Sequence, residues 1–137
     1  MPFANPGDGL IRDLLMRTRT VAVVGLSPKA GRPSHAVARY MQQAGYRIIP
    51  VRPAVDAVLG EPAYADLRDL PETPDLVDVF RAPEHVAPIV DACIELGVPA
   101  VWLQEGVVDA EAARRARDAG LIVVMDRCVL KDHARLC

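Results

Sequence analysis

Five short apolar segments recur along the 137-residue chain and predict the strands of one sheet. The segments are rich in Val and Ile and are mostly apolar on both faces. That pattern is typical of parallel strands that are covered by helices on both sides. The predicted strands span residues 21–24, 47–51, 76–80, 100–103 and 121–125.

Apolar residues at three- and four-residue spacing predict one helix before the first strand and another after it. Asp8 is expected to cap the first of these helices, whose apolar face includes Leu10 and Leu14. Ser34 is expected to cap the second helix, and Gly45 supplies its stop signal. The first half of the chain therefore reads as helix, strand, helix, strand.

The same spacing predicts two more helices in the second half of the chain. The third helix carries Pro83 in its first turn, where the missing N–H is tolerated, and ends at Gly97. Asp109 is expected to cap a fourth, alanine-rich helix that stops at Gly120. Asp132, further along, has the appearance of a charge on a helix surface.

Strands and helices alternate along the chain, which favours βαβ units with right-handed crossovers. We therefore expect an α/β fold, namely a Rossmann-like doubly wound sheet of five mainly parallel strands with helices on both faces. Residues 53–73 lack a strong period, so we expect a long loop there with a short helix near 66–70. Residues 1–137 are predicted to form one domain, with ligands binding beyond the carboxyl ends of the strands.

Composition narrows the class of protein. Apolar residues make up 51% of the chain and the net charge is −2, without a basic block, so we expect a globular protein and no nucleic-acid partner. No apolar run approaches the roughly 20 residues of a membrane span. The three cysteines lack CxxC spacing and neighbouring His pairs. They predict neither a disulfide framework nor a metal site, and favour a cytoplasmic protein with reduced thiols.

The segment at 20–34, TVAVVGLSPKAGRPS, carries the clearest candidate chemistry. An apolar strand runs into Gly25, and a polar loop with Ser27, Lys29 and Arg32 follows before Ser34 begins a helix. Backbone N–H groups at a helix start are unpaired, and the helix dipole adds positive charge there. This order of elements therefore predicts a site for a ligand that carries phosphates.

Two common phosphate-binding patterns are missing. Of the dinucleotide fingerprint G-x-G-x-x-G only Gly25 is in place, and five residues separate it from Gly31 where a P-loop has four. The second strand ends at Arg52-Pro53 instead of the carboxylate that binds the ribose of NAD. Because Arg52 would attract a further phosphate, the ligand is either NADP or another nucleotide with an extra ribose phosphate, such as coenzyme A (CoA).

Several separated segments together resemble the small stand-alone CoA-binding proteins, whose fold is like the N-terminal CoA-binding domain of the succinyl-CoA synthetase alpha subunit. The matching segments are AVVGLSPKAGRPSHAVARYMQQAGYRIIPVRP at 22–53, VDVFR at 77–81, VWLQEG at 101–106 and VVMDRC at 123–128. The resemblance covers roughly residues 10–136. It implies a Rossmann-like CoA-binding domain that stands alone, and it does not imply catalysis.

The resemblance also implies which residues hold the phosphates. Arg52 and Pro53 should lie near the adenosine and its 3′-phosphate. The related synthetase domain has a lysine after the second strand's proline, where this chain has Ala54 and Val55, so Arg52 is the substitute available. The residues that should hold the pyrophosphate are Gly25, Ser27, Lys29, Arg32 and Ser34.

For the rest of the ligand the resemblance places Phe80, Arg81 and Pro83 along the adenine or the pantetheine, and Gln104 and Glu105 where the cleft closes near the pantetheine. These residues follow the third and fourth predicted strands. Packing is an equal alternative for Phe80, whereas Trp102, inside a strand, is expected in the core.

Cys128 follows the last predicted strand and has two interpretations. Its thiol could lie near the thiol end of CoA, open to a mixed disulfide, or it could be an inert buried cysteine, which is the commoner case. A Cys128–His133 dyad is a third and much weaker alternative, because a nucleophile also needs an orienting group.

Three functions remain open at this stage. The favoured one is a binding or regulatory module for CoA or an acyl-CoA. The alternative is an enzyme, either an NADP-linked reductase or a CoA-dependent transferase, although no acid, base or nucleophile can be placed. The third is a regulatory or interaction protein whose bound CoA controls a protein partner, which the sequence does not separate from the first, and a homo-oligomer also remains open.

Overall fold

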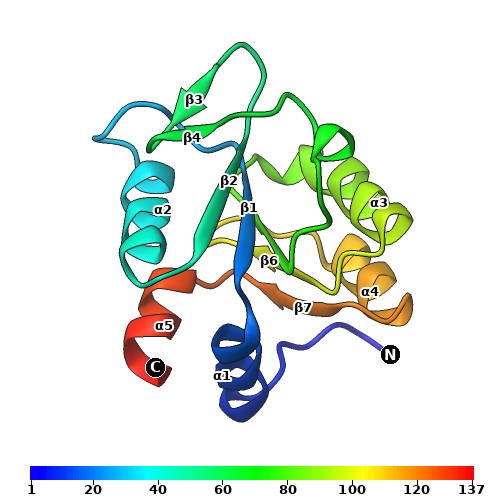
Figure 1. Cartoon of the computed structure of the whole chain (residues 1–137). Helices are drawn as coiled ribbons and strands as arrows, with labels where there is room; N and C mark the ends of the chain where they lie inside the picture. Colours follow the sequence, from blue (N-terminus) through cyan, green and yellow to red (C-terminus); the bar gives the residue numbers. More distant parts are fainter.

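A computed structural model describes all of residues 1–137 and contains a five-stranded sheet in the order β2-β1-β5-β6-β7 (Figure 1). Every pair of neighbouring strands in it is parallel. The doubly wound fold is thereby confirmed, and each strand lies within one residue of its predicted bounds. The strands are β1 (Thr20–Val24), β2 (Arg47–Val51), β5 (Leu76–Val79), β6 (Ala100–Leu103) and β7 (Ile122–Met125).

Helices cover both faces of this sheet and bury two apolar clusters (Figure 1). On one face Ile11, Val37 and Val129 pack with the fully buried Trp102, which confirms that Trp102 belongs to the core. The helices of this face are α1 (Asp8–Arg17), α2 (Pro33–Gln43) and α5 (Val129–Leu136). The opposite face carries α3 (Val86–Leu96) and α4 (Ala110–Asp118).

The strand order places a switch point between β1 and β5. The chain first adds β2 on one side of β1 and then returns to add β5, β6 and β7 on the other side. Loops that follow β1 and β5 therefore leave the sheet in opposite directions, which opens a crevice at their carboxyl ends. Ligands of doubly wound sheets bind in such a crevice.

Residues 53–73 are more ordered than their sequence suggests. A two-stranded antiparallel hairpin pairs β3 (Ala57–Val58) with β4 (Glu61–Pro62). The short helix expected near 66–70 is confirmed as the 3-10 helix η1 (Leu67–Asp69). The third predicted helix begins with a second 3-10 turn, η2 (Pro83–His85), before α3, and ends as expected at Gly97 with a left-handed backbone.

The last helix, α5, has no counterpart among the elements predicted from sequence. Its 8 residues are strongly amphipathic, so the sequence carries a helix signal that the prediction missed. Tertiary contacts hold it in place: Val129 is fully buried against the sheet, and Tyr40 of α2 bonds the Nδ1 atom of His133 at 2.9 Å.

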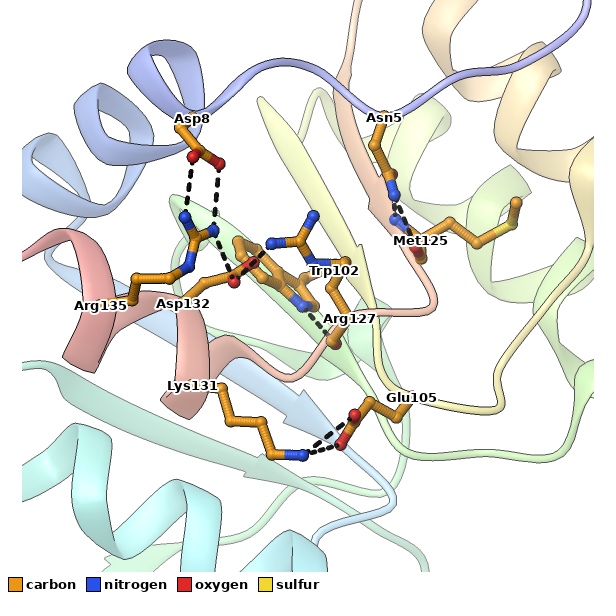
Figure 2. Close-up of polar contacts among 9 residues, drawn as sticks. All are labelled: Asn5, Asp8, Trp102, Glu105, Met125, Arg127, Lys131, Asp132 and Arg135. Carbon is orange, nitrogen blue, oxygen red and sulfur yellow. Dashed lines mark hydrogen bonds and ion pairs between the residues drawn. The ribbon is translucent and has the colours of Figure 1, made fainter.

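The interpretation of Asp132 as a surface charge is wrong. Its side chain is only 4% exposed, and Oδ1 accepts from Arg127 at 2.7 Å and from Arg135 at 3.2 Å (Figure 2). Arg135 also holds Asp8 of α1 with two bonds, at 2.7 and 3.0 Å. A buried carboxylate needs such partners, and these pairs tie α5 to α1 and to the end of β7.

Only one of the three predicted helix caps is correct. Asp109 accepts a hydrogen bond from the Ala112 N–H at 3.0 Å and caps α4. Asp8 lies inside α1 and makes no cap bond, because its carboxylate is held by Arg135. Ser34 lies inside α2, which begins at Pro33, and its hydroxyl is used elsewhere.

The Asp109 cap gives a simple test of the fold. Asp109→Ala should lower the free energy of unfolding by about 1 kcal/mol, because the Ala112 N–H loses its acceptor at the start of α4. Urea denaturation measures the effect. Asp13→Ala is the control: Asp13 is exposed on α1 and should change stability by less than about 0.5 kcal/mol. Equal stability of both variants would contradict the capping role.

No helix of the chain has the length and apolar character needed to cross a membrane. The longest helices have 11 residues.

Candidate functional site

A cleft of about 560 Å³ opens at the carboxyl ends of the strands, beside the start of α2. It lies on the face of the sheet that α2 and α5 cover. The structure brings most of the sequence-predicted site residues together here. Those that line the cleft are Gly25, Ser27, Lys29, Arg32, Ser34, Arg52, Phe80, Gln104, Glu105 and Cys128.

The other predicted residues lie elsewhere. Pro53 and Arg81 line a second cavity of about 270 Å³, whose walls include η1 and α3 on the opposite face of the sheet. Val24 lines this cavity while the next residue, Gly25, lines the cleft, so the end of β1 separates the two spaces. Pro83 is exposed in η2 and lines neither of them.

Gly25 occupies a position that only glycine can fill. Its φ is +86°, in the left-handed region, and a Cβ placed on it would lie 2.4 Å from the carbonyl oxygen of Phe80. The close approach arises because Phe80 N donates to Val24 O at 2.9 Å as β1 and β5 end side by side. This contact brings the loop after β1 down onto the switch point.

The two serines of the loop brace it from within. The Ser34 hydroxyl accepts from the Ser27 N–H at 2.9 Å, and the Ser27 hydroxyl accepts from the Lys29 N–H at 3.1 Å. Both side chains are buried. Ser27 and Ser34 therefore shape the loop through these bonds, and the loop presents its cationic side chains to the cleft.

Three cationic side chains meet in the cleft without acidic partners. Lys29 and Arg32 are exposed and Arg52 is half-buried, and none of them joins an ion pair of the chain. Unpaired cations beside a helix N-terminus form a strong anion site. Glu105 differs, since both its carboxylate oxygens lie 3.2 Å from the Nζ of Lys131 on α5 (Figure 2).

Several cleft residues were missed from the sequence. They are apolar or conformationally rigid, and therefore carry no chemical signal of their own. Val37 could have been found, because it stands one helical turn after Ser34 on the face that meets the loop. The missed residues are Pro28, Pro33, Val37 and Val107.

A buried carboxyl group lies beneath the cleft. Asp78 of β5 is 1% exposed, and the Gln104 Nε2 atom donates to its Oδ1 at 2.5 Å. Burial raises the pKa of Asp78 to about 7, and the bond from Gln104 opposes that rise. Sequence reasoning did not single out Asp78, although an acid within a strand that is apolar on both faces is a signal in itself.

The raised pKa of Asp78 predicts a pH-dependent stability. An unfolded aspartate titrates near about 3.9. Between that pH and about 7 the folded chain keeps a proton that the unfolded chain has released, so this group's contribution to stability falls as pH rises. Asp78→Asn removes the titration, so its stability relative to the unmodified chain should rise by more than about 1 kcal/mol from pH 5 to pH 8.

Urea denaturation at the two pH values measures this difference. Asp13→Asn is the matched control, because Asp13 is exposed and should show no such change. A stability difference for Asp78→Asn that is the same at pH 5 and pH 8 would contradict the prediction.

The cysteines have distinct environments. Cys93 of α3 is buried, and burial raises its pKa to about 12. Cys128 is half-buried and lines the cleft, which contradicts its interpretation as a fully buried residue. The ring of His133 bonds Tyr40 at 2.9 Å and makes no hydrogen bond to Cys128. No group of three or more His, Cys, Asp or Glu side chains is placed to hold a metal ion.

Comparison with known proteins identifies the family. The model of the CoA-binding domain matches residues 19–134 of this chain. The chain belongs to the CoA-binding domain family. This confirms the resemblance inferred from the loop after the first strand and the segments that follow the later strands.

Relatives of this CoA-binding domain occur both alone and inside larger chains. The Bacillus subtilis protein YneT is 39% identical over 130 residues, covering 95% of this chain and 96% of YneT. A solved structure from Pyrococcus horikoshii is 36% identical with a TM-score of 0.93, covering 99% of this chain and 96% of its own. The ADP-forming acetate–CoA ligase II of Archaeoglobus fulgidus is 30% identical over 77% of this chain, which corresponds to 17% of the ligase.

Proposed function

We propose that this chain binds CoA or an acyl-CoA in the cleft at the carboxyl ends of the strands, as a non-catalytic binding or regulatory module. The observation that carries the proposal is the convergence of Lys29, Arg32 and Arg52, all without acidic partners, on one cleft of about 560 Å³. A ligand with a pyrophosphate and a further phosphate supplies the charges that these side chains lack. Membership of the CoA-binding domain family supports the choice of ligand.

The pyrophosphate is assigned to the loop after β1. There the start of α2 offers unpaired backbone N–H groups, and Lys29 and Arg32 neutralise the charge. Arg52, just after β2, is the candidate for the 3′-phosphate, since no lysine follows Pro53. The three phosphate groups then lie along the edge formed by β1 and β2.

The two ends of the ligand are assigned to the two spaces that the end of β1 separates. The pantetheine arm extends along the cleft between apolar and polar walls that include Phe80, Val37 and Gln104, and its thiol end approaches Cys128. The adenine is assigned to the smaller cavity, where Pro53 and Arg81 form part of the wall. A volume of about 270 Å³ is adequate for a purine ring.

The proposal treats residues 1–137 as one binding domain that acts in the cytoplasm. Relatives of nearly the same length, such as YneT, are compatible with a domain that functions alone. The match to a small part of an ADP-forming acetate–CoA ligase is compatible with a module that other proteins join to catalytic parts. A protein partner whose binding depends on CoA fits the regulatory form of the proposal.

Calorimetric titration with CoA, dephospho-CoA and NADPH tests the proposal directly. We expect CoA to bind, and dephospho-CoA to bind about 10-fold or more weakly, because one charge-assisted contact to the 3′-phosphate is lost. Binding of NADPH without CoA would instead favour a reductase. Binding of none of the three would contradict the assignment of the cleft.

A further inference from the structure

Asp78 and Gln104 form an isolated polar pair under the floor of the cleft. Asp78 lies in the central strand, in register with Val23 of β1 and Trp102 of β6, so its neighbours in the sheet are apolar or aromatic. The bond from Gln104 is the only hydrogen bond its side chain makes. An acid in such surroundings costs stability, as its raised pKa indicates, so the fold alone gives no reason for it.

Gln104 connects this acid to the cleft. Its side chain is 4% exposed, lines the cleft, and uses Nε2 to donate to Asp78. A carboxylate only accepts hydrogen bonds, so it fixes the amide with the nitrogen inward. No group of the protein donates a hydrogen bond to the remaining amide oxygen, Oε1. Oε1 is also not among the fully buried polar atoms without a hydrogen bond, so it is accessible. Oε1 is therefore an acceptor offered to the cleft.

We propose that Asp78 is a positioning residue that turns the Gln104 carbonyl oxygen toward the cleft, where it accepts an N–H of the ligand's pantetheine arm. The inference rests on the proposed function, which assigns the arm to this cleft. Pantetheine carries two secondary amides, and each has an N–H donor that needs an acceptor once it leaves water. Gln104 supplies one such acceptor.

The protonation state of Asp78 controls this acceptor. A neutral carboxyl group has an O–H donor. When the Gln104 amide rotates, this O–H donates to Oε1, and the amide nitrogen Nε2 then faces the cleft. The arm's N–H loses its acceptor in that state. Because the pKa of Asp78 is about 7, the exchange takes place near neutral pH, and affinity for the arm rises as pH rises through 7.

Other titratable groups lie close enough to be considered. Asp132 of α5 is paired with Arg127 and Arg135, and the ring of His133 bonds Tyr40, while His35 stands in the first turn of α2. None of these bonds Asp78 or Gln104. The charged and titratable groups that share the cleft with Gln104 are Lys29, Arg32, Arg52, Glu105 and Cys128. All of these groups are unchanged in Asp78→Asn. The difference in pH dependence of affinity between the two chains therefore reports Asp78 alone.

The test is calorimetric titration with dephospho-CoA at pH 6 and pH 8. This ligand lacks the 3′-phosphate, whose second ionisation near pH 6 would add a pH dependence of its own. The affinity for dephospho-CoA should increase by about 3- to 10-fold from pH 6 to pH 8, because one neutral hydrogen bond to the ligand is gained and contributes about that much. Asp78→Asn should show no such increase. Asp75→Asn, which changes the residue just before the start of the same strand, should keep it.

A second pair of measurements does not depend on Asp78→Asn folding. At pH 8, Gln104→Leu should weaken dephospho-CoA by about 3- to 10-fold more than it weakens ADP, which lacks the arm. Any of three outcomes would overturn this inference while leaving the proposed function intact. They are equal losses of affinity for the two ligands, an affinity for dephospho-CoA that does not change with pH, and a pH dependence retained in Asp78→Asn. Failure of both CoA and dephospho-CoA to bind at either pH would overturn the proposed function as well.

Discussion

Replacing Lys29 and Arg32 together by alanine is expected to weaken CoA binding by about 3 to 6 kcal/mol, since each charge-assisted bond to a phosphate contributes about 1.5–3 kcal/mol. The two side chains line the cleft beside the start of α2 and have no acidic partner in the chain. Their positive charge is therefore available to a ligand without first breaking an ion pair. Calorimetric titration with CoA measures the loss.

The control must separate contact from overall charge. Arg17→Ala with Arg19→Ala removes the same two positive charges, but at the opposite edge of the sheet, just before β1. Both arginines are exposed, and their side chains take part in no ion pair. This double variant should bind CoA within about threefold of the unmodified chain at physiological salt, where charges beyond roughly 8 Å are screened. Similar affinity losses in both double variants would contradict the assigned pyrophosphate site.

Gly25→Ala is expected to cost about 3 kcal/mol or more of stability and to abolish CoA binding. A left-handed backbone costs an alanine about 1–2 kcal/mol, and its Cβ would lie 2.4 Å from the Phe80 carbonyl oxygen, a backbone atom that cannot rotate away. The loop after β1 must then lift from the end of β5, which moves Lys29 and Arg32 away from the cleft. Urea denaturation and CoA titration measure the two losses.

Gly31→Ala is the matched control in the same loop. A Cβ on Gly31 meets no atom within 4 Å, and its φ lies outside the left-handed region. The same chemical change should therefore leave stability within about 0.5 kcal/mol of the unmodified chain. If Gly25→Ala were as stable as Gly31→Ala, the close contact between β1 and β5 would have no role in holding the loop.

Much of the fold was predictable because its signals are local. Strands buried on both faces appear as continuous apolar runs, and the end of α3 at Gly97 follows from the one residue that adopts a left-handed backbone without strain. The cap at Asp109 is equally local, since donor and acceptor lie three residues apart. For α5 the amphipathic pattern is a local signal of a helix, but contacts with α1 and α2 that are distant in sequence decide its place.

The candidate site was predictable in outline for a related reason. In a doubly wound sheet all parallel strands end at the same edge, so residues that follow different strands, such as Lys29, Arg52 and Gln104, meet without any knowledge of side-chain packing. The face of the sheet on which each of these side chains lies was not predictable. Arg81 lies two residues after the end of β5, yet it lines the cavity on the α3 face, separate from the cleft.

The sequence by itself therefore determined the alternation of strands and helices, the cationic loop after β1, and the family through its ordered motifs, because each depends on residues close together in the chain or on the topology they impose. Only the tertiary structure decided how individual polar side chains are used. Ser34 braces the loop instead of capping α2, Asp132 joins an ion-pair network, and Asp78 holds Gln104 under the cleft. These roles depend on burial and on partners from distant segments, which exist only after the helices have packed on the sheet.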